Sequence, residues 1–532
     1  MRLLTPVLWA GAVLMLATSV RGTIRYVPSD YPTIQAGIDA ALEGDTVLVA
    51  GGLYTGAGNR DLDFNGRNLL VTSENGPAAT VIDCEGSLSD PHRGFIFRSG
   101  EDSTSVVRGF MIRHGYAYGV WPENCGGGIY CYLSSPAIVE NWITDNTACH
   151  SGGGIYSFHG SASLVDNVIS GNTAYGVGGG IFCDWYPRFT IDGNTIMANT
   201  GSSGGGIVCS HCSARIVGNV IKWNTATAGA GGGILSWSSS PLIIENLITE
   251  NTGVEGGAIC CENPSIPAVE HNLIADNTAA EKGGGILCVS SSPSLDGNTI
   301  AGNQAAQGGG ISCRGYSIVT IVNTVLWGDH ASTDPEIHVE GEASVSGTYS
   351  DVAGGWSGEG NIDVDPLFVP GPRGDYYLSQ MESGQPWQSP CVDGGDTISA
   401  VPERTTRTDE LCEEWPVDMG YHYPGCLVLV DEESRVIASR HSCYLGHNYP
   451  NPFCSSTTIA YSLAVPTEVT IAVYDVRGAL VRTLVSEYAA AGQHVAVWDG
   501  RNQRGHRVGS GVYFCCLSTE RHTETRRMVL LH

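Results

Sequence analysis

Positive charge is scarce in this chain of 532 residues. Lysine occurs only at Lys222 and Lys282, and Lys and Arg together number 27 against 54 Asp and Glu, a formal net charge of −27. Nucleic-acid binding draws on clustered basic side chains, and an acidic surface repels polyanions. The composition therefore excludes nucleic acid as a partner, and it predicts that a polyuronate ligand would need bridging cations.

Long apolar runs are nearly absent as well. One run extends from Leu3 to Val20 after Arg2, and Val20-Arg21-Gly22 follows as a candidate cleavage site. We interpret residues 1–22 as a signal peptide. A membrane anchor is the alternative, which the shortness of the run and Pro6 disfavour. The sequence thus predicts an exported chain, secreted or held at a cell surface, whose mature part has no transmembrane segment.

What the chain has instead is a repeat. The sequence Gly-Gly-Gly-Ile recurs every 25 to 27 residues, and a second pattern, Asn-x-Ile-x-x-Asn, keeps the same period from Asn141 onward, with an eighth, degraded copy that starts at Asn323. A fixed period of this length indicates a solenoid. Because the unit is poor in helix formers and rich in Gly, Ser, Thr and Asn, we predict an all-β fold, a parallel β-helix in which the asparagines stack in register. The first pattern begins at Gly126, Gly152, Gly178, Gly204, Gly231, Gly283 and Gly308, with the variant Gly256-Gly257-Ala258-Ile259 between the fifth and sixth.

Alternation along each strand predicts which side chains enter the core. With the repeat isoleucine inside, the residue two positions later is also inside. These residues form a small-residue column, in which we expect the six cysteines to be unpaired fillers. The column is Cys131, Ser157, Cys183, Cys209, Ser236, Cys261, Cys288 and Cys313.

Other cysteines suggest different roles. An exported chain with 18 cysteines favours disulfides, and Cys391, Cys412, Cys426, Cys443 and Cys454 crowd a loop-rich stretch where bridges are expected without a readable connectivity. The segment Cys209-Ser210-His211-Cys212 has the spacing of half a zinc site. Because no second Cys/His pair accompanies it, we interpret this segment as structural packing.

The two repeat patterns resemble those of the polymorphic outer-membrane proteins, which are autotransporter adhesins within the right-handed parallel β-helix, pectin-lyase-like class. The resemblance covers residues 23–423. It implies a right-handed β-helix and leaves the activity open, since this fold carries lyases, hydrolases, adhesins and scaffolds. Apolar residues Ile34, Ile38, Ala41 and Leu42 after Thr33 predict a short capped helix that covers the first coil, which also resembles the start of pectin-lyase-like proteins.

The last part of the chain has a different pattern, in which alternating residues at 457–461, 469–475, 494–500 and 511–514 predict four strands of a small immunoglobulin-like β-sandwich. Four motifs in it resemble the FlgD-like immunoglobulin fold and the C-terminal sorting domains of type IX secretion, which implies export, surface attachment and contact with secretion machinery. Cys454 departs from the usual final Asn, so cleavage of this domain stays open. The motifs are Tyr449-Pro450-Asn451-Pro452-Phe453, Tyr474-Asp475-Val476-Arg477-Gly478, Trp498-Asp499-Gly500 and Ser510-Gly511-Val512-Tyr513.

Domain boundaries follow from these patterns. We predict the N-terminal cap and first coils at residues 23–104, the regular repeats at 105–350, a terminal coil and closing segment at 351–425, a linker at 426–445 and the immunoglobulin-like domain at 446–532.

Candidate catalytic residues are few. Pectate-lyase-like enzymes use calcium-binding acids and a basic residue, and related hydrolases use paired carboxylates. Glu250 and Asp276 stand at equivalent positions of adjacent coils, and Arg188 and Arg215 are the basic residues nearest such a groove. Nothing in the sequence orients an acid or base beside them, so we expect no catalysis. Calcium is the one cofactor that the sequence suggests, with Asp363, Asp365, Asp393 and Asp396 as ligands. Turn carboxylates beside Gly and Pro are the simpler explanation of these residues, and we prefer it.

Aromatic residues on the outward side of successive strands favour binding. Flat rings along a ladder suit sugar faces or a partner protein, and the opposing interpretation is that a loop or the C-terminal domain covers them. We therefore predict a surface or extracellular binding protein whose partner is a polysaccharide or a surface protein, with a polysaccharide lyase or glycoside hydrolase as the alternative. The aromatic candidates are Tyr130, Tyr132, Tyr156, Phe158, Phe182, Trp185 and Trp237.

Overall fold

The structure is a computed structural model, which describes residues 22–185, 189–396, 399, 404–412, 416–424, 444–449, 453, 456–463, 467–475, 479–489, 492–519 and 523–530. The predicted signal peptide, except its last residue, and most of the predicted linker lie outside these residues. Two compact units make up the chain, Met1–Ala268 with Asp276–Ser291 and Val269–Ala275 with Ser292–His532.

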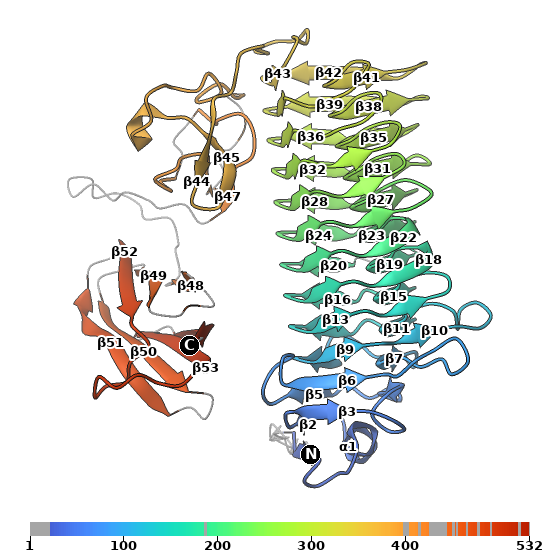
Figure 1. Cartoon of the computed structure of the whole chain (residues 1–532), viewed down its shortest axis with the longest axis vertical. Coiled ribbons are helices and arrows are strands. Elements are labelled where there is room, and N and C mark those ends of the chain that lie inside the picture. The colour runs from blue at the N-terminus through green and yellow to red at the C-terminus, as the bar shows by residue number, and fades with distance from the viewer. Residues whose placement is uncertain are drawn as a thin grey trace, which may run out of the picture. The chain divides into compact units, whose positions relative to one another are not determined.

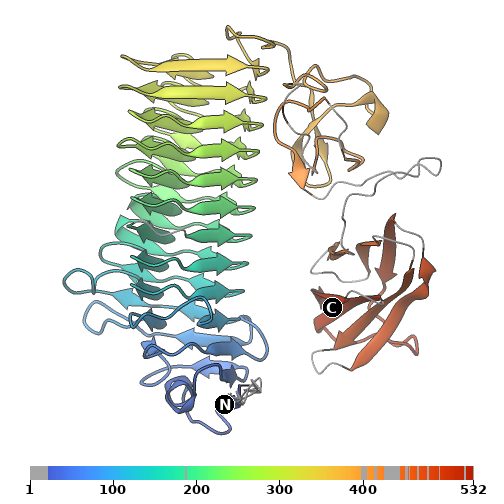
Figure 2. The ribbon, with the colours of Figure 1, turned by 180° about the vertical axis from the view of Figure 1, so that it is seen from behind.

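Most strands belong to a right-handed parallel β-helix of about 13 turns, which confirms the predicted fold class. Short strands of successive coils stack in parallel, as Figure 1 shows, and Figure 2 shows the same stacking from behind. We call the four sheets A, B, C and D; they contain 13, 12, 11 and 7 strands. Sheets A, B and C gain a strand from almost every coil, whereas the short strands of sheet D precede the glycine triplets.

Sheet A consists of β1 (Ile24–Val27), β2 (Thr46–Val49), β5 (Leu70–Ser73), β8 (Val106–Arg108), β12 (Ala137–Val139), β16 (Ser163–Val165), β20 (Thr190–Asp192), β24 (Arg215–Val217), β28 (Leu242–Ile244), β32 (Ala268–Glu270), β36 (Ser294–Asp296), β39 (Ile318–Val322) and β42 (Ser344–Thr348). Sheet B consists of β3 (Gly52–Tyr54), β6 (Thr80–Asp83), β9 (Met111–Arg113), β13 (Trp142–Thr144), β17 (Val168–Ser170), β21 (Thr195–Met197), β25 (Val220–Lys222), β29 (Leu247–Thr249), β33 (Leu273–Ala275), β37 (Thr299–Ala301), β40 (Val325–Trp327) and β43 (Asp351–Val352).

Sheet C consists of β4 (Leu62–Asp63), β7 (Phe95–Phe97), β11 (Ile129–Tyr132), β15 (Ile155–Phe158), β19 (Ile181–Asp184), β23 (Ile207–Ser210), β27 (Ile234–Trp237), β31 (Ile259–Glu262), β35 (Ile286–Val289), β38 (Ile311–Arg314) and β41 (Ile337–Val339). Sheet D consists of β10 (Tyr116–Ala117), β14 (Thr147–Ala148), β18 (Thr173–Val177), β22 (Thr200–Ser203), β26 (Thr225–Ala226), β30 (Thr252–Gly253) and β34 (Thr278–Ala279).

The core of the coils follows the predicted alternation. On sheet C, Ile129 pairs with Ile155 and Cys131 with Ser157, and the next coils continue the register. The repeat isoleucines and the small-residue column are fully buried. All six cysteines of the column are free thiols, as predicted. Among the other cysteines, Cys391 is free and Cys412 is disulfide-bonded, while Cys426, Cys443 and Cys454 lie outside the described residues.

Glycine triplets allow the chain to turn tightly onto sheet C. The first glycine of each triplet has positive φ, 67° at Gly152 for example, a region that only glycine enters without strain. At the second position a side chain is sterically impossible, because a Cβ on Gly153 would lie 2.4 Å from the Gly179 carbonyl oxygen of the next coil.

Asparagine ladders fasten the turns, as predicted. Asn167 Oδ1 accepts from the Asn141 backbone N–H at 2.9 Å and from its Nδ2 at 3.2 Å, and Asn172 does the same for Asn146. The predicted start of the eighth copy at Asn323 is wrong by one residue. Thr324 is the position in register with Asn298, because Val325 pairs with Thr299 and the Asn298 backbone N–H donates to Thr324 Oγ1.

The α-helix α1 (Ile34–Ala40) precedes the first complete coil. Thr33 Oγ1 caps it by accepting from the Ala36 N–H at 3.2 Å, as predicted. Ile34 and Ile38 are buried, whereas Leu42 is 69% exposed. Placing Leu42 on the apolar face was wrong because the helix ends before it. Within the described part of the chain, no helix has the length and apolar character needed to cross a membrane.

Residues after β43 form a small closing segment with β44 (Phe368–Gly371), β45 (Gly374–Leu378), the 3₁₀ helix η1 (Met381–Ser383), β46 (Arg404–Thr405) and β47 (Tyr423–Pro424). It packs on the final coils of its own unit. The Tyr421 N–H donates to Thr299 Oγ1 at 2.8 Å, and Leu378, Cys391 and Met419 share an apolar cluster with Val325.

The last strands form two antiparallel sheets around one core. One sheet contains β48 (Tyr444–Tyr449), β49 (Thr457–Leu463) and β52 (Gly492–Trp498), and the other contains β50 (Thr467–Asp475), β51 (Leu480–Ala489), β53 (Gly511–Thr519) and β54 (Thr523–Leu530). Trp498, Ile471 and Cys515 lie in the shared core. Four of these strands correspond to predicted ones, and β48, β51 and β54 are additional.

Candidate functional site

Aromatic rings stack along the outward side of sheet C. Tyr156 lies between Tyr130 and Phe182, with ring centroids 5.6 and 5.4 Å away. A second row places Tyr132 over Phe158 at 5.6 Å. The coil spacing of the β-helix sets these distances, because each ring stands at the same position of its strand.

Four of these rings are covered by other parts of the chain. Tyr156 and Phe182 are only 1% and 8% exposed, and Tyr130 and Phe158 are buried too. The reason lies in the segments that lead into the glycine triplets. Cys125, Val177 and Ala230 from these segments join the outward ring column in one apolar cluster. Of the two interpretations that the sequence left open, cover by a neighbouring segment therefore applies to these four residues.

A pocket of about 370 Å³ remains open beside the covered rings. Tyr156, Phe158 and Phe182 form part of its wall, and two tryptophans complete the aromatic lining. Trp121, from the loop between β10 and β11, is 52% exposed and packs edge-on against Phe158 at 5.6 Å. Trp185, which follows β19, is 43% exposed. The pocket is also lined by His150, Ser151, His159 and Asp184.

The polar side chains of the pocket lining contact aromatic rings or other polar side chains. His159 stacks on Trp185 at 5.3 Å, and Trp185 stacks on His211 at 5.9 Å, so an imidazole lies on either side of the indole. The Asp184 carboxylate accepts from the Trp185 backbone N–H at 2.9 Å and lies 3.3 Å from His211 Nδ1. His150 Nδ1 is 2.7 Å from Ser151 Oγ. An apolar wall with a few fixed polar groups is the usual form of a small-ligand site.

Burial raises the pKa of Asp184, and hydrogen bonds with Ser210 and His211 oppose that effect. The Asp184 carboxylate is thus partly shielded from water at the pocket wall. A hydrogen-bond donor of a ligand would replace few water contacts when it binds there.

Three predicted binding residues lie outside the lining of this pocket. Tyr130 is covered by the Arg93 guanidinium, 5.2 Å from its ring centre, and Tyr132 is half-buried. Trp237 is 42% exposed, two coils beyond Trp185. The structure therefore gathers Tyr156, Phe158, Phe182 and Trp185 in the pocket lining. Tyr130 and Tyr132 stack on two of these rings without lining the pocket, and Trp237 lies apart.

Sequence reasoning missed Trp121, His150, His159 and Asp184. Trp121 belongs to an irregular loop just before the first triplet, where the period has not yet begun. His159 and Trp185 have positive φ, 53° and 67°, at the same corner of successive coils. Because His159, Trp185 and His211 occupy equivalent positions of successive coils, aligning the repeats at this position would have predicted the stack of imidazole and indole rings.

The described catalytic candidates come from two different sheets of the β-helix. Glu250 accepts from Trp223 Nε1 at 2.5 Å and lies 3.9 Å from Lys222 Nζ. Asp276 is exposed at the equivalent corner of the next coil. Both corners follow sheet B strands, whereas Arg215 belongs to sheet A. Arg188 lies outside the described residues.

The four aspartates considered for calcium stand mostly in local turns. Asp363 Oδ1 accepts from the Gly354 N–H at 3.0 Å, and Asp365 Oδ1 accepts from the Leu367 N–H at 2.9 Å. Asp393 and Asp396 use their backbone N–H groups to bind Asp418 and Asn323, both at 2.7 Å. Within the described residues, the single cluster of metal-ligating side chains is Cys183, Cys209 and Cys212.

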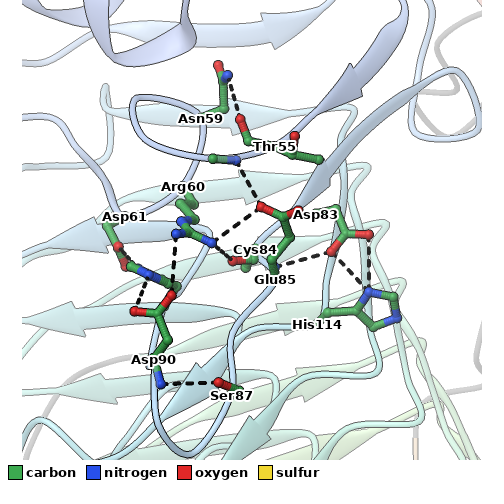
Figure 3. A network of polar contacts seen from close by, with 12 residues as sticks. Thr55, Asn59, Arg60, Asp61, Asp83, Cys84, Glu85, Ser87, Asp90 and His114 are labelled. Atoms are coloured by element: carbon green, nitrogen blue, oxygen red, sulfur yellow. Dashed lines mark hydrogen bonds and ion pairs between the residues drawn. The ribbon is translucent and has the colours of Figure 1, made fainter.

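A charged network crosses the first coils, as Figure 3 shows. Arg60 Nη1 donates to the Cys84 carbonyl at 3.0 Å and pairs with Glu85, and Arg60 Nη2 lies 3.6 Å from Asp90. His114 and Arg113 both lie 3.0 Å from the Asp83 carboxylate. Burial alone would raise the pKa of Asp83, but these partners and the Glu85 N–H lower it overall. The network joins neighbouring coils and holds its basic groups in ion pairs.

Comparisons with solved structures give remote similarities. PorU from Porphyromonas gingivalis is 22% identical over 18% of this chain and 10% of that protein, with a TM-score of 0.15. PorZ, a surface component of the type IX secretion system of the same organism, is 22% identical over 17% of this chain and 11% of its own, with a TM-score of 0.13. The chain thus spans about a tenth of the length of each. Pectate lyase Pel9A is 14% identical over 73% of this chain and 90% of that chain, with a TM-score of 0.36.

No curated protein sequence matches the chain. Two family models match parts of it. Residues 178–326 match the right handed beta helix region, and residues 455–521 match the FlgD Ig-like domain.

Proposed function

We propose that this is an exported β-helix protein that binds carbohydrate in the pocket between Trp121 and Trp185 and does not cleave it. The observation that carries the proposal is the aromatic wall with two half-open indoles and one fixed carboxylate. Sugar rings present flat C–H faces that pack on aromatic rings and hydroxyls that donate to carboxylates.

Size and charge narrow the ligand class. A volume of about 370 Å³ lies near the lower end of small-molecule sites and fits one or two sugar rings. Asp184 and the net charge of −27 oppose a polyuronate. A neutral glycan, or a glycan end with neutral hydroxyls, is therefore the proposed ligand.

The side chains that line the pocket argue against glycoside hydrolysis. Glycoside hydrolysis by the two-carboxylate route needs a pair of carboxyl groups flanking the bond. The described lining residues include a single carboxylate, Asp184. Binding without turnover is thus the function that the lining supports best.

Export and surface attachment are the second part of the proposal. The apolar run Leu3–Val20 supports export by a signal peptide, and the match of residues 455–521 to the FlgD Ig-like domain supports an attachment module. We expect the full chain to appear outside the producing cell, and a chain that stops at residue 425 to be released instead of retained at the surface. Cell fractionation checks this, and retention of the full chain in the cytoplasm would contradict it.

The binding proposal is tested with the purified chain on a panel of polysaccharides and oligosaccharides, with and without calcium. Bound glycan and new absorbance from unsaturated ends, together with reducing sugar, are recorded in the same samples. Saturable binding of a neutral glycan without product is the expected result. Product formation from any substrate would contradict the non-catalytic assignment, and silence on both readouts would contradict carbohydrate binding.

A further inference from the structure

Three thiols meet inside the coils beneath the pocket. Cys183 on β19 and Cys209 on β23 are neighbours in the inward column, and Cys212 lies in the turn after β23. Cys183 Sγ is 3.7 Å from Cys209 Sγ and 3.6 Å from Cys212 Sγ, and all three sulfurs lie within 4.8 Å of one another. Cys183 and Cys209 are fully buried and Cys212 is nearly so.

Cys212 replaces a residue that is serine in the following coils. Its backbone N–H donates to Ser239 Oγ at 3.1 Å, the Ser239 N–H donates to Ser265 Oγ at 3.2 Å, and the Ser265 N–H donates to Ser291 Oγ at 3.0 Å. A serine at position 212 would continue this ladder. The column cysteines Cys261 and Cys288 are also neighbours, but serines occupy the turns beside them. The third sulfur is therefore a local departure from the repeat.

We propose that Cys183, Cys209 and Cys212 bind one Zn²⁺ as a structural site. Zinc binds thiolates at about 2.3 Å, which places the sulfurs of a tetrahedral site about 3.8 Å apart. The two close sulfur pairs lie within 0.2 Å of that edge, at 3.6 and 3.7 Å. The binding step releases three thiol protons as three Zn–S bonds form, so that the zinc and its thiolates carry a net charge of −1.

A polar group of the same column supports the site. Ser157, on the preceding strand, pairs with Cys183, and its buried Oγ has no hydrogen-bond partner among the described residues. Structural zinc sites take four ligands. The Ser157 hydroxyl is a column neighbour of Cys183 whose oxygen could complete the site, either directly or through a water molecule. His211 is not a ligand, since its side chain is half-exposed and its Nδ1 faces Asp184.

The site would clamp the strands that carry the pocket wall. Cys183 lies between Phe182 and Asp184 on β19, and those two side chains line the pocket on the opposite face of the strand. Metal binding fixes two adjacent coils at this level because one ligand set spans both. The zinc proposal does not depend on the carbohydrate proposal.

Metal titration of the full chain tests the inference. The reduced, chelator-treated protein is titrated with Co²⁺, whose thiolate charge-transfer band reports sulfur ligation, and then with Zn²⁺ as competitor. One Co²⁺ per chain, displaced by one Zn²⁺, is expected. Cys212→Ser, which restores the residue of the other coils, should weaken binding by about 100-fold or more, since a ligand is lost. Cys131→Ser, in the same column but away from the cluster, should bind like the parent.

Thermal unfolding and thiol counting complete the test. Zn²⁺ should raise the unfolding temperature of the parent and of Cys131→Ser but not of Cys212→Ser. Equal metal binding by parent and Cys212→Ser would overturn the proposal. So would the absence of metal uptake by a folded parent, or a thiol count showing that two of the three cysteines form a disulfide.

Discussion

At the scale of single residues, Asp329 interrupts an asparagine ladder with a buried carboxyl. Its Oδ1 accepts from the backbone N–H and Nδ2 of Asn303 at 2.7 and 2.9 Å. Its Oδ2 and Oε2 of Glu336 are buried and have no hydrogen-bond partner in the part of the chain that the structure describes. Burial, followed by the charge of Glu336, raises the pKa of Asp329 well above its ordinary value, and burial also raises the pKa of Glu336.

Asp329→Asn should therefore stabilise the protein. A raised pKa in the folded state means that stability is lost as the pH rises from the ordinary carboxyl pKa through the folded one. Asparagine carries no charge and can donate to Glu336. We expect the free energy of unfolding at pH 7 to rise by about 1–3 kcal/mol and the gain to shrink toward pH 4. Chemical denaturation at both pH values checks this, and a less stable variant at pH 7 would contradict it.

His271 shows the opposite dependence on pH. Burial, with the positive charges of His422 and Arg404 as smaller causes, lowers its pKa to about 4. The ring packs edge-on against His422 at 5.8 Å. Since an unfolded histidine takes up its proton near pH 6.5, stability is complete above that pH and is lost as the pH falls toward 4.

His271→Gln should remove this part of the acid sensitivity, up to about 3 kcal/mol between pH 6.5 and 4. The measurement is the free energy of unfolding of both proteins across that range. His506→Gln, an exposed histidine of the C-terminal sheets, serves as the control. Identical pH dependence of His271→Gln and the parent would contradict the assignment.

At the scale of elements, the ladders hold the coils in register. Asn199 Oδ1 accepts from the Asn172 backbone N–H and Nδ2 at 3.0 Å, and its own Nδ2 donates to the Ile169 carbonyl at 2.8 Å. All of these groups are buried, so no water replaces a lost partner.

Asn199→Ala should lower the free energy of unfolding by about 3 kcal/mol, because it leaves the Asn172 N–H and the Ile169 carbonyl unpaired. Asn75→Ala, an exposed asparagine that accepts one bond from the Gly51 N–H, should change it by less than about 1 kcal/mol. Denaturant unfolding of the two variants compares them, and equal losses would show that the ladder does not have this role.

Sequence reasoning reached the elements whose spacing is regular. The isoleucine period, the inward cysteine column, the capped helix and four strands of the C-terminal sheets could be predicted because each depends on local alternation. Whether Tyr156 and Phe182 are covered could not be decided from the sequence, because the cover comes from segments such as Val177 that lie close only after the coil closes. β51 was not predicted because its side chains do not alternate regularly. Its pairing with β50 shifts register between Ile471 and Ala472 and again between Val473 and Tyr474. Of the aromatic lining of the candidate pocket, Tyr156, Phe158, Phe182 and Trp185 were named from the repeat, whereas Trp121 was not because it lies in a loop outside the repeat.

At the scale of the molecule, the β-helix provides a rigid frame for stacked rings. Coil spacing fixes the ring centroids at 5.4 to 5.6 Å along the two rows, so the pocket wall is formed before a ligand arrives. A preformed wall reduces the entropy lost on binding. Under the proposed binding function, the net charge of −27 would disfavour polyanionic ligands.

Calorimetric titration of the best neutral glycan from the panel into the parent, Trp185→Ala and Trp237→Ala tests the central claim most directly. The two tryptophans are almost equally exposed, 43% and 42%, but only Trp185 lines the pocket. Loss of one stacking indole should weaken binding by about tenfold in Trp185→Ala, and Trp237→Ala should bind like the parent. Equal affinity of all three proteins, or a loss in Trp237→Ala alone, would contradict the pocket as the carbohydrate site.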